Sequence, residues 1–162
     1  MRIWIAAVGA KPRAGFDELA RVYLERMAPY GSTVEAPMFK SEQALWAAVE
    51  KERARTAPRV VLLDERGEQM GSEAFAQWLG RERDTGRQLV IFAVGPADGW
   101  KKQGTGNRVQ GTEKRSAGEV MSLSLGAMTM AHELARVVLC EQVYRALTIL
   151  AGHPYHRAGS RQ

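Results

Sequence analysis

Leu89-Val90-Ile91-Phe92-Ala93-Val94 is continuously apolar and leads directly into Gly95-Pro96. An apolar run without polar alternation is typical of a strand that is covered on both faces, as in a parallel sheet. Val60-Val61-Leu62-Leu63 has the same character. With two further segments near the start of the chain, these runs predict four strands. They are expected at Arg2–Val8, Thr33–Phe39, Arg59–Asp64 and Gln88–Gly95.

Helical patterns lie between these predicted strands. The first has apolar residues at spacings of three and four and ends before Pro29. Ser41 and Ser72 precede two more such patterns, and we predict that each serine caps its helix. Strands that alternate with helices predict an α/β fold with a mainly parallel sheet and helices on both faces. Because no repeat or linker divides the sequence, residues 1–162 are expected to form a single domain.

The last predicted helix, from about His132 to Leu150, is apolar nearly all round. A helix of this kind must be covered on every side, so we expect a second subunit to supply part of the cover. Glu141 and Arg145 stand four residues apart within it and can form an ion pair. Cys140 is the one cysteine of the chain and is predicted to be a buried, inert thiol.

The composition limits the classes of function to consider. Lys and Arg outnumber Asp and Glu by 23 to 18, which gives a net charge of +5 and favours a polyanionic partner such as nucleic acid. A single cysteine and three histidines without metal-type spacing give no reason to expect a metal site. No apolar run approaches the roughly 20 residues of a membrane helix, and residues 3–8 are too short for a signal peptide. We therefore expect a cytoplasmic protein that does not enter a membrane.

Gly95 and Pro96 follow a predicted buried strand, and ligands of α/β proteins usually bind beyond the carboxyl ends of such strands. A glycine there lets the backbone approach a ligand closely. Neither phosphate-binding fingerprint is met, because no Gly-x-Gly-x-x-Gly follows the first strand and Gly111 is followed by Thr112 rather than by lysine. A tight turn that holds no ligand is equally compatible with these two residues.

Residues 97–118 form a glycine-rich insertion that carries five lysines and arginines. The glycines predict flexibility, and the cations favour a polyanion. This segment is therefore either a solvated surface loop or a direct contact to RNA.

Two segments near the end of the chain have unusual composition. Residues 121–132 mix small, hydroxyl and apolar side chains directly before the last helix, which suits an uncharged heterocycle such as adenine but equally suits a buried connection. His153-Pro154-Tyr155-His156-Arg157 can stack on a base, contact a phosphate or move a proton, and can equally be a frayed tail.

Taken in order along the chain, these features resemble the ribosomal large-subunit pseudouridine methyltransferase H family, a minimal branch of the SPOUT methyltransferases. The resemblance covers nearly the whole chain and is most specific in the last third. It rests on Ile5-Ala6-Ala7-Val8-Gly9, Leu62-Leu63-Asp64, Gly95-Pro96, Ser122-Leu123-Ser124, Met128-Thr129, His132, Leu134-Ala135-Arg136-Val137, Glu141-Gln142, Tyr144-Arg145-Ala146 and the tail His153–Arg157.

This resemblance implies a SPOUT-type α/β domain whose C-terminal segment threads a trefoil knot, a feature that is nearly absent from other proteins. It also implies a homodimer packed through the knot region. The implied substrate is a pseudouridine of 23S ribosomal RNA, methylated at N3 on the assembled ribosome. The implied cofactor is S-adenosylmethionine, held by Leu63, Gly95, Gly126, Ala127, Met128, Thr129, Met130 and Ala131.

The resemblance also assigns roles to the tail and to nearby polar residues. We predict that Tyr155 or His156 assists removal of the proton from N3, and that Arg157 holds a phosphate or the edge of the base. The predicted RNA-binding residues are His132, Arg136 and His153. Arg136 is equally a candidate for a structural ion pair.

The chain departs from the family pattern in three places. Val94 stands where the family usually has the first of two glycines, the segment between Gly95 and Ser124 is longer, and residues 158–162 extend past the usual end. Alternative functions are methylation of another RNA site or of unmodified uridine, and an RNA-binding, ribosome-associated factor that has lost catalysis. A small-molecule α/β enzyme is a third alternative, against which the absent nucleotide fingerprints count.

Overall fold

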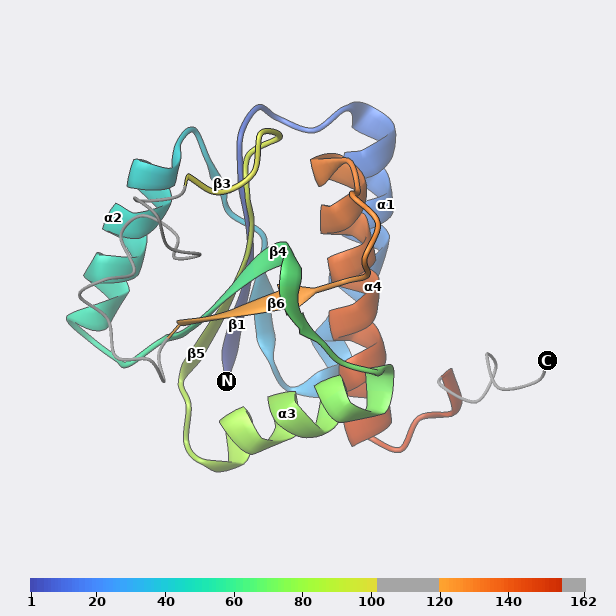
Figure 1. Cartoon of the computed structure of the whole chain (residues 1–162). Helices are drawn as coiled ribbons and strands as arrows, with labels where there is room; N and C mark the ends of the chain where they lie inside the picture. Colours follow the sequence, from blue (N-terminus) through green and yellow to red (C-terminus); the bar gives the residue numbers. More distant parts are fainter. Residues whose placement is uncertain (102–119, 156–162) are drawn as a thin grey trace.

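The computed structural model describes residues 1–101 and 120–155, and Figure 1 shows the arrangement of their elements. Parallel strands form one sheet, which helices cover on both faces, as the apolar runs predict. The strands are β1 (Arg2–Val8), β2 (Thr33–Glu35), β3 (Met38–Phe39), β4 (Arg59–Gln69), β5 (Leu89–Val94) and β6 (Val120–Ser124). The helices are α1 (Ala14–Met27), the short 3-10 helix η1 (Ala28–Tyr30), α2 (Glu42–Arg53), α3 (Ser72–Asp84) and α4 (His132–Leu150).

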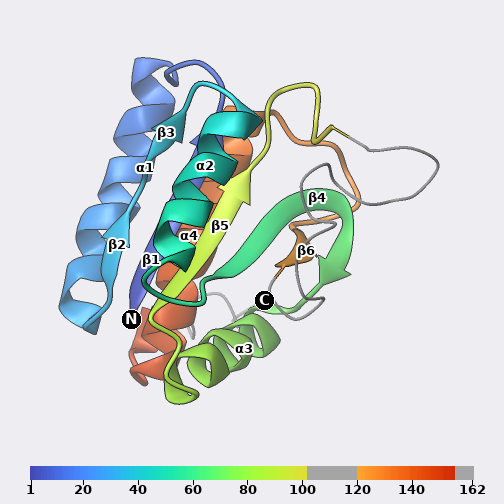
Figure 2. The same cartoon turned by 90° about the vertical axis from the view of Figure 1, so that its left-hand side faces the viewer.

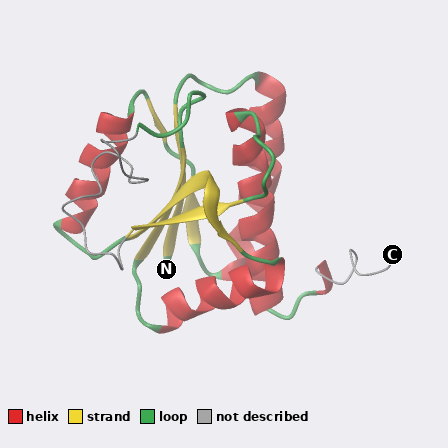
Figure 3. Ribbon diagram, in the orientation of Figure 1, coloured by secondary structure: helices red, strands yellow, loops and turns green. Residues whose placement is uncertain are grey.

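The sheet has the strand order β2-β1-β5-β4-β6, with β3 pairing with β1 beyond β2, and every pairing between described strands is parallel. Alternate residues of each central strand point to opposite faces. On one face Ile3, Val90 and Phe92 pack against α1, α3 and α4. On the other face Trp4 and Ile91 pack against α2. Figure 3 shows these three layers, with the sheet between the helices.

The predicted strand Thr33–Phe39 is divided into β2 and β3, because Pro37 interrupts the pairing with β1. A proline has no N–H to donate to a sheet, but its carbonyl oxygen still accepts a hydrogen bond from the amide of Ala7 at 3.1 Å. Strand β6 was not predicted at all. Its sequence, with Ser122 and Ser124 on either side of Leu123, resembles a loop in composition, and it is stabilised by its pairing with β4.

Strand β4 is longer than predicted and folds around β6. It pairs with β6 up to Leu63 and then again from Glu68, so that Leu123 is the partner of both residues. Figure 2 shows this bend as a broad arc of β4 over β6. The predicted strand ended at Asp64 because the polar residues 64–69 break the apolar pattern. These residues lie at the edge of the sheet and are largely exposed, so they need no apolar side chains.

Gly67 allows the bend of β4 to lie against β6. A Cβ atom at this position would lie 2.7 Å from backbone atoms of Leu123, which is closer than atoms can pack. We expect Gly67→Ala to lower the free energy of unfolding by about 1–3 kcal/mol, because paired backbone cannot move aside as a side-chain tip can. Urea unfolding measures the change, with Gly15→Ala as the control, since nothing lies within 4 Å of a Cβ at Gly15. Equal stability of the two variants would contradict this packing.

The sequence predicts that Ser41 and Ser72 cap two helices, and the structure bears out one of these two predictions. Ser41 caps α2, and its hydroxyl accepts a hydrogen bond from the amide of Ala44 at 3.2 Å. The prediction for Ser72 is wrong, because Gly71 occupies the cap position and Ser72 is the first residue of α3. The Ser72 hydroxyl instead donates to the side-chain oxygen of Gln142 on α4, at 3.2 Å, and so joins two helices.

Helix α4 has the predicted bounds, and its own chain covers most of it. Within α4, all of which is described, Leu134 is the one large apolar side chain that is exposed. The residues of one chain therefore cover more of α4 than its apolar pattern led us to expect. Cys140 is buried as predicted, and burial raises the pKa of its thiol to about 11. None of the described helices is long and apolar enough to cross a membrane.

Candidate functional site

A pocket of about 420 Å³ lies at the bend of β4, beyond the ends of β5 and β6 and beside the start of α4. Its walls come from three segments that are far apart in the sequence: residues 63–66 at the bend of β4, residues 94–100 after β5, and residues 123–135 around the start of α4. The carboxyl ends of parallel strands are the usual place for a ligand in an α/β fold. This edge of the sheet is therefore the first place to look for function.

Most of the predicted cofactor residues lie together in this pocket. Its lining includes Leu63, Gly95, Gly126, Met128, Thr129 and Met130, and the predicted RNA-binding residue His132. Ala127 and Ala131 belong to the same loop, but they are exposed and do not line the pocket. The fold thus brings together three segments that the sequence separates by about thirty residues each.

Trp100 forms one wall and was not predicted. It is 7% exposed, and its indole nitrogen donates a hydrogen bond to the carbonyl oxygen of Leu63 at 2.8 Å. The ring also explains Gly95, because a Cβ there would lie 2.9 Å from Trp100. The glycine was expected to admit a ligand to the backbone, whereas the structure shows that it admits this ring.

Within the predicted flexible insertion, Trp100 is therefore packed against the rest of the chain. A turn closed by a 2.8 Å bond from the Gly99 amide to the Pro96 carbonyl directs Trp100 inward, and the Lys101 amide donates to Glu42 on α2 at 3.1 Å. The rest of the predicted insertion, residues 102–118, lies outside the described residues. Val94, the departure from the family pattern, is buried and pairs with Ala7 and Leu63 as an ordinary residue of β5.

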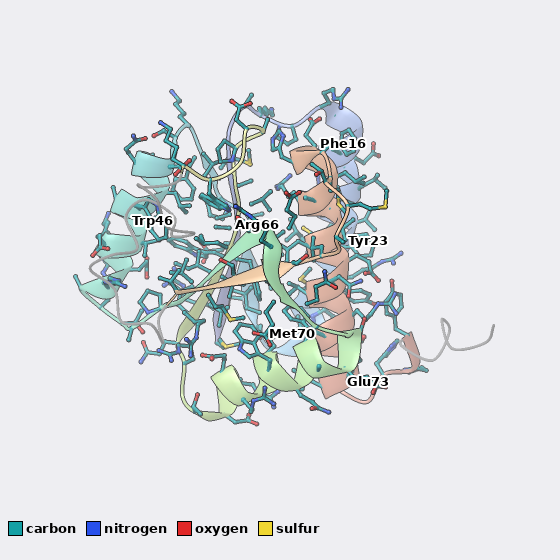
Figure 4. The ribbon with its side chains drawn as sticks, viewed as in Figure 1. Phe16, Tyr23, Trp46, Arg66, Met70 and Glu73 are labelled. Atoms are coloured by element: carbon teal, nitrogen blue, oxygen red, sulfur yellow. The ribbon has the colours of Figure 1, made fainter. Side chains whose placement is uncertain are left out.

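The bend of β4 supplies charged groups to the pocket. Asp64 and Arg66 form an ion pair of 2.8 Å, and Glu65 accepts a 2.8 Å hydrogen bond from the hydroxyl of Thr129. The latter bond joins the β4 bend to the loop before α4. Figure 4 labels Arg66, which lies in front of the sheet. The pattern of apolar residues does not predict that these charged residues lie at the pocket. The one available signal is the position of Asp64 directly after a buried strand.

Arg136 lies outside the pocket. It is 5% exposed, and its guanidinium pairs with Asp17 of α1 at 3.3 Å, so it joins the two helices. This arrangement agrees with the structural ion pair that the sequence left open, and it does not bring Arg136 to the other predicted site residues.

The described part of the tail is also separate from the pocket. Tyr155 contacts Glu141, Tyr144 and Arg145, which lie on the opposite face of α4 from His132 and Ala135 at 100° per residue. Glu141 is also about 13 Å further along the helix axis than His132. His153 lies beside Tyr30, with 6.3 Å between their ring centroids. His156 and Arg157, like residues 158–162, are outside the described residues.

Tyr155 is held in its protonated form. Burial of its ring, together with the nearby Glu141 carboxylate, raises the pKa of its hydroxyl to about 12. The hydroxyl donates to that carboxylate at 3.2 Å. In this position the Tyr155 hydroxyl donates its hydrogen bond to Glu141, and the predicted role of Tyr155 or His156 in removing the N3 proton stays a prediction.

The described residues contain no group of three or more His, Cys, Asp or Glu side chains that could hold a metal ion. The polar groups of the pocket are instead two carboxylates at the β4 bend, an arginine, a threonine and a histidine, together with Asp98. Apolar walls with a few convergent polar groups are typical of a site for a small organic molecule.

Comparison with known proteins identifies the family. Residues 1–156 match the family model described as predicted SPOUT methyltransferase. A protein of Koribacter versatilis is 46% identical over 156 residues, covering 96% of this chain and 98% of its own. Proteins of Brucella anthropi and Rhizobium meliloti are 37% and 38% identical over 171 residues, covering 98% of this chain and all of their own. All three are named ribosomal RNA large subunit methyltransferase H. The chain therefore belongs to the SPOUT methyltransferase family.

Proposed function

We propose that this chain transfers a methyl group from S-adenosylmethionine to N3 of a pseudouridine in 23S ribosomal RNA, acting in the cytoplasm on the assembled ribosome as a homodimer. The observation that carries this proposal is the gathering of Leu63, Gly95, Gly126 and residues 128–130 around one pocket. The family and the names of the relatives support the reaction, and the net charge of +5 supports a polyanionic partner.

The pocket fits S-adenosylmethionine in size and chemistry. A volume of about 420 Å³ is within the range of small-molecule sites. Leu63, Leu125, Met128 and Met130 supply apolar walls for a nucleoside base. Asp64, Glu65 and Asp98 outnumber Arg66 among the charged lining residues, which favours a ligand with a positive charge. When bound, this cofactor supplies a methyl group on a positively charged sulfur.

The chain's own contribution is to orient the reactants and to manage one proton. A pocket with fixed walls aligns a donor and an acceptor, which can be worth roughly 7–11 kcal/mol of the barrier. The imide N3–H of the substrate must lose its proton, and a positioned base contributes about 10²–10⁴-fold. Because Tyr155 is hydrogen-bonded to Glu141, His156 is the tail residue best suited to this role, with Arg157 holding a phosphate or the base edge.

A second copy of the chain brings the tail to the pocket in this proposal. Tyr155 lies on the opposite face of α4 from the pocket of its own chain. In a dimer, the tail of one chain can approach the pocket of the other. The exposed apolar side chains Leu19, Val22 and Leu134, on α1 and α4, support an association through these two packed helices.

Gly95 offers a test of the donor pocket. We expect Gly95→Ala to weaken S-adenosylmethionine binding about tenfold or more, because the added Cβ displaces Trp100 and its hydrogen bond to Leu63. Calorimetric titration measures the Kd. Adding Trp100→Phe to the Gly95→Ala chain makes room for the Cβ and is expected to restore part of the affinity. Unchanged affinity in Gly95→Ala would place the donor elsewhere.

Methyl transfer to ribosomes tests the whole reaction. Ribosomes from cells that lack the pseudouridine are compared with ribosomes that contain it but lack its methyl group. We expect labelled methyl from S-adenosylmethionine to enter only the latter, as N3-methylpseudouridine in 23S RNA. Methylation of both would indicate a uridine substrate, and label in another nucleotide a different RNA site. RNA binding without any donor binding would instead indicate a factor that has lost catalysis.

A further inference from the structure

All four tyrosines of the chain lie in one cluster where the tail meets α4. The ring of Tyr144, on α4, is its centre. Its centroid lies 6.0 Å from Tyr23 of α1, 6.0 Å from Tyr30 of η1 and 4.7 Å from Tyr155 of the tail. Figure 4 labels Tyr23 at the side of the molecule where α1 and α4 pack together. Aromatic pairs at such distances stabilise a contact beyond the area that they bury.

Glu141 connects this cluster to a hydrogen-bond network. Its Oε1 atom accepts bonds from the Tyr155 hydroxyl at 3.2 Å and from two nitrogens of Arg145 at 3.0 and 2.5 Å. The Arg145 guanidinium also lies over the Tyr155 ring, 5.0 Å from its centroid. Tyr155 is thus held at its hydroxyl by Glu141, on one side by Arg145 and on another by Tyr144. We call these four residues the tail clamp.

The backbone is built to deliver Tyr155 to this place. Gly152 has a φ of +68°, in the left-handed range that is typical of a helix cap, and the amide of His153 donates to the carbonyl of Thr148 at 2.9 Å. This cap reverses the chain after α4 and turns it back along the helix. A segment at the end of a chain is ordinarily poorly ordered unless it is tied down. Here, both a helix cap and side-chain contacts tie it down.

We propose that Glu141 and Arg145 are positioning residues for the methyl transfer, which act by clamping Tyr155 against α4 so that His156 and Arg157 begin from a fixed point. This inference rests on the proposed function, because it assigns the reaction to the tail. Tyr155 is then an anchor rather than a proton acceptor. A tail that is already held at Tyr155 loses less conformational freedom when it binds RNA.

Four variants test the clamp. Tyr155→Phe removes the hydroxyl bonded to Glu141 and keeps the ring, while Glu141→Leu removes the acceptor. Glu141→Gln is the conservative change, because its amide oxygen still accepts a hydrogen bond. Tyr23→Phe is the matched control, since it removes a hydroxyl from the same cluster and leaves the Glu141–Tyr155 bond in place. Each variant is assayed for kcat on ribosomes, for the Kd of S-adenosylmethionine and for amide hydrogen exchange in residues 151–155.

We expect Tyr155→Phe and Glu141→Leu to lower kcat about tenfold, the equivalent of one hydrogen bond to a charged group. Amide exchange in residues 151–155 should become faster, while donor affinity stays within about twofold. Glu141→Gln should recover most of the kcat, and Tyr23→Phe should resemble the unaltered protein. Normal kcat in both Tyr155→Phe and Glu141→Leu, with an active unaltered protein, would overturn the clamp alone. An unaltered protein without methyl transfer would overturn the proposed function and this inference with it.

Discussion

Removal of residues 156–162 is expected to lower kcat for methyl transfer by about 10²–10⁴-fold, the usual contribution of a positioned base. The truncation deletes His156 and Arg157 but leaves every residue that lines the pocket. The Kd for S-adenosylmethionine should therefore stay within about twofold. Single-turnover assays on ribosomes, combined with calorimetry on the same preparation, separate the loss of chemistry from the loss of donor binding.

A shorter truncation is the matched control for this prediction. Removing only residues 158–162 deletes the extension past the usual end of the family and retains both His156 and Arg157. We expect it to keep normal activity, or to gain some if the extension crowds the site. His156→Ala and Arg157→Ala then divide the effect between the base and the phosphate contact. Full activity after removal of residues 156–162 would show that the tail has no part in catalysis.

Mixed dimers are expected to recover activity from two impaired chains. One parent is the chain truncated after Tyr155, which keeps its pocket, and the other is Gly95→Ala, which keeps its tail. The assay uses a concentration of S-adenosylmethionine well below the Kd of the Gly95→Ala chain, so that the pocket of this parent stays largely empty. If the tail of one subunit serves the pocket of the other, each mixed dimer contains one intact site. Random exchange of subunits makes half of the dimers mixed, so the mixture should reach about one quarter of the normal rate.

The same experiment has a sharp negative result. If each tail served the pocket of its own chain, neither parent would contribute an intact site to a mixed dimer. The activity of the mixture would then equal the mean of the two parents. Sedimentation of each parent shows whether it is still a dimer, and a monomeric unaltered protein would contradict the arrangement directly.

The sequence predicted the elements that are covered mainly by other elements of the chain. β1 and α4 have the predicted bounds, because most residues of both are apolar and are covered by other elements. The elements that were missed depend on each other instead. β6 and the second half of β4 contain serines and charged residues, and they are stable as strands because each pairs with the other. The sequence of either strand taken alone does not indicate such a pairing.

The predictions for the site divide in a similar way. The resemblance to the family identified residues in three separate segments, which the fold brings to one pocket. The composition of these segments alone could not have related them to one another. Trp100 was missed because it was assigned to a flexible loop, and its partner Gly95 was given a different role. The knot and the dimer remain predictions from the resemblance. The tail clamp was missed because its tyrosines are scattered from α1 to the end of the chain, and only their packing relates them.

If this chain methylates one pseudouridine of 23S ribosomal RNA, its loss should leave that nucleotide without its methyl group. Mass mapping of ribosomal RNA from cells without this protein tests it most directly. We expect a single pseudouridine of 23S RNA to lose its N3 methyl group, and the full chain to restore this group while the chain truncated after Tyr155 does not. An unchanged set of methylated nucleotides, or a methyl group lost from a different kind of nucleotide, would contradict it.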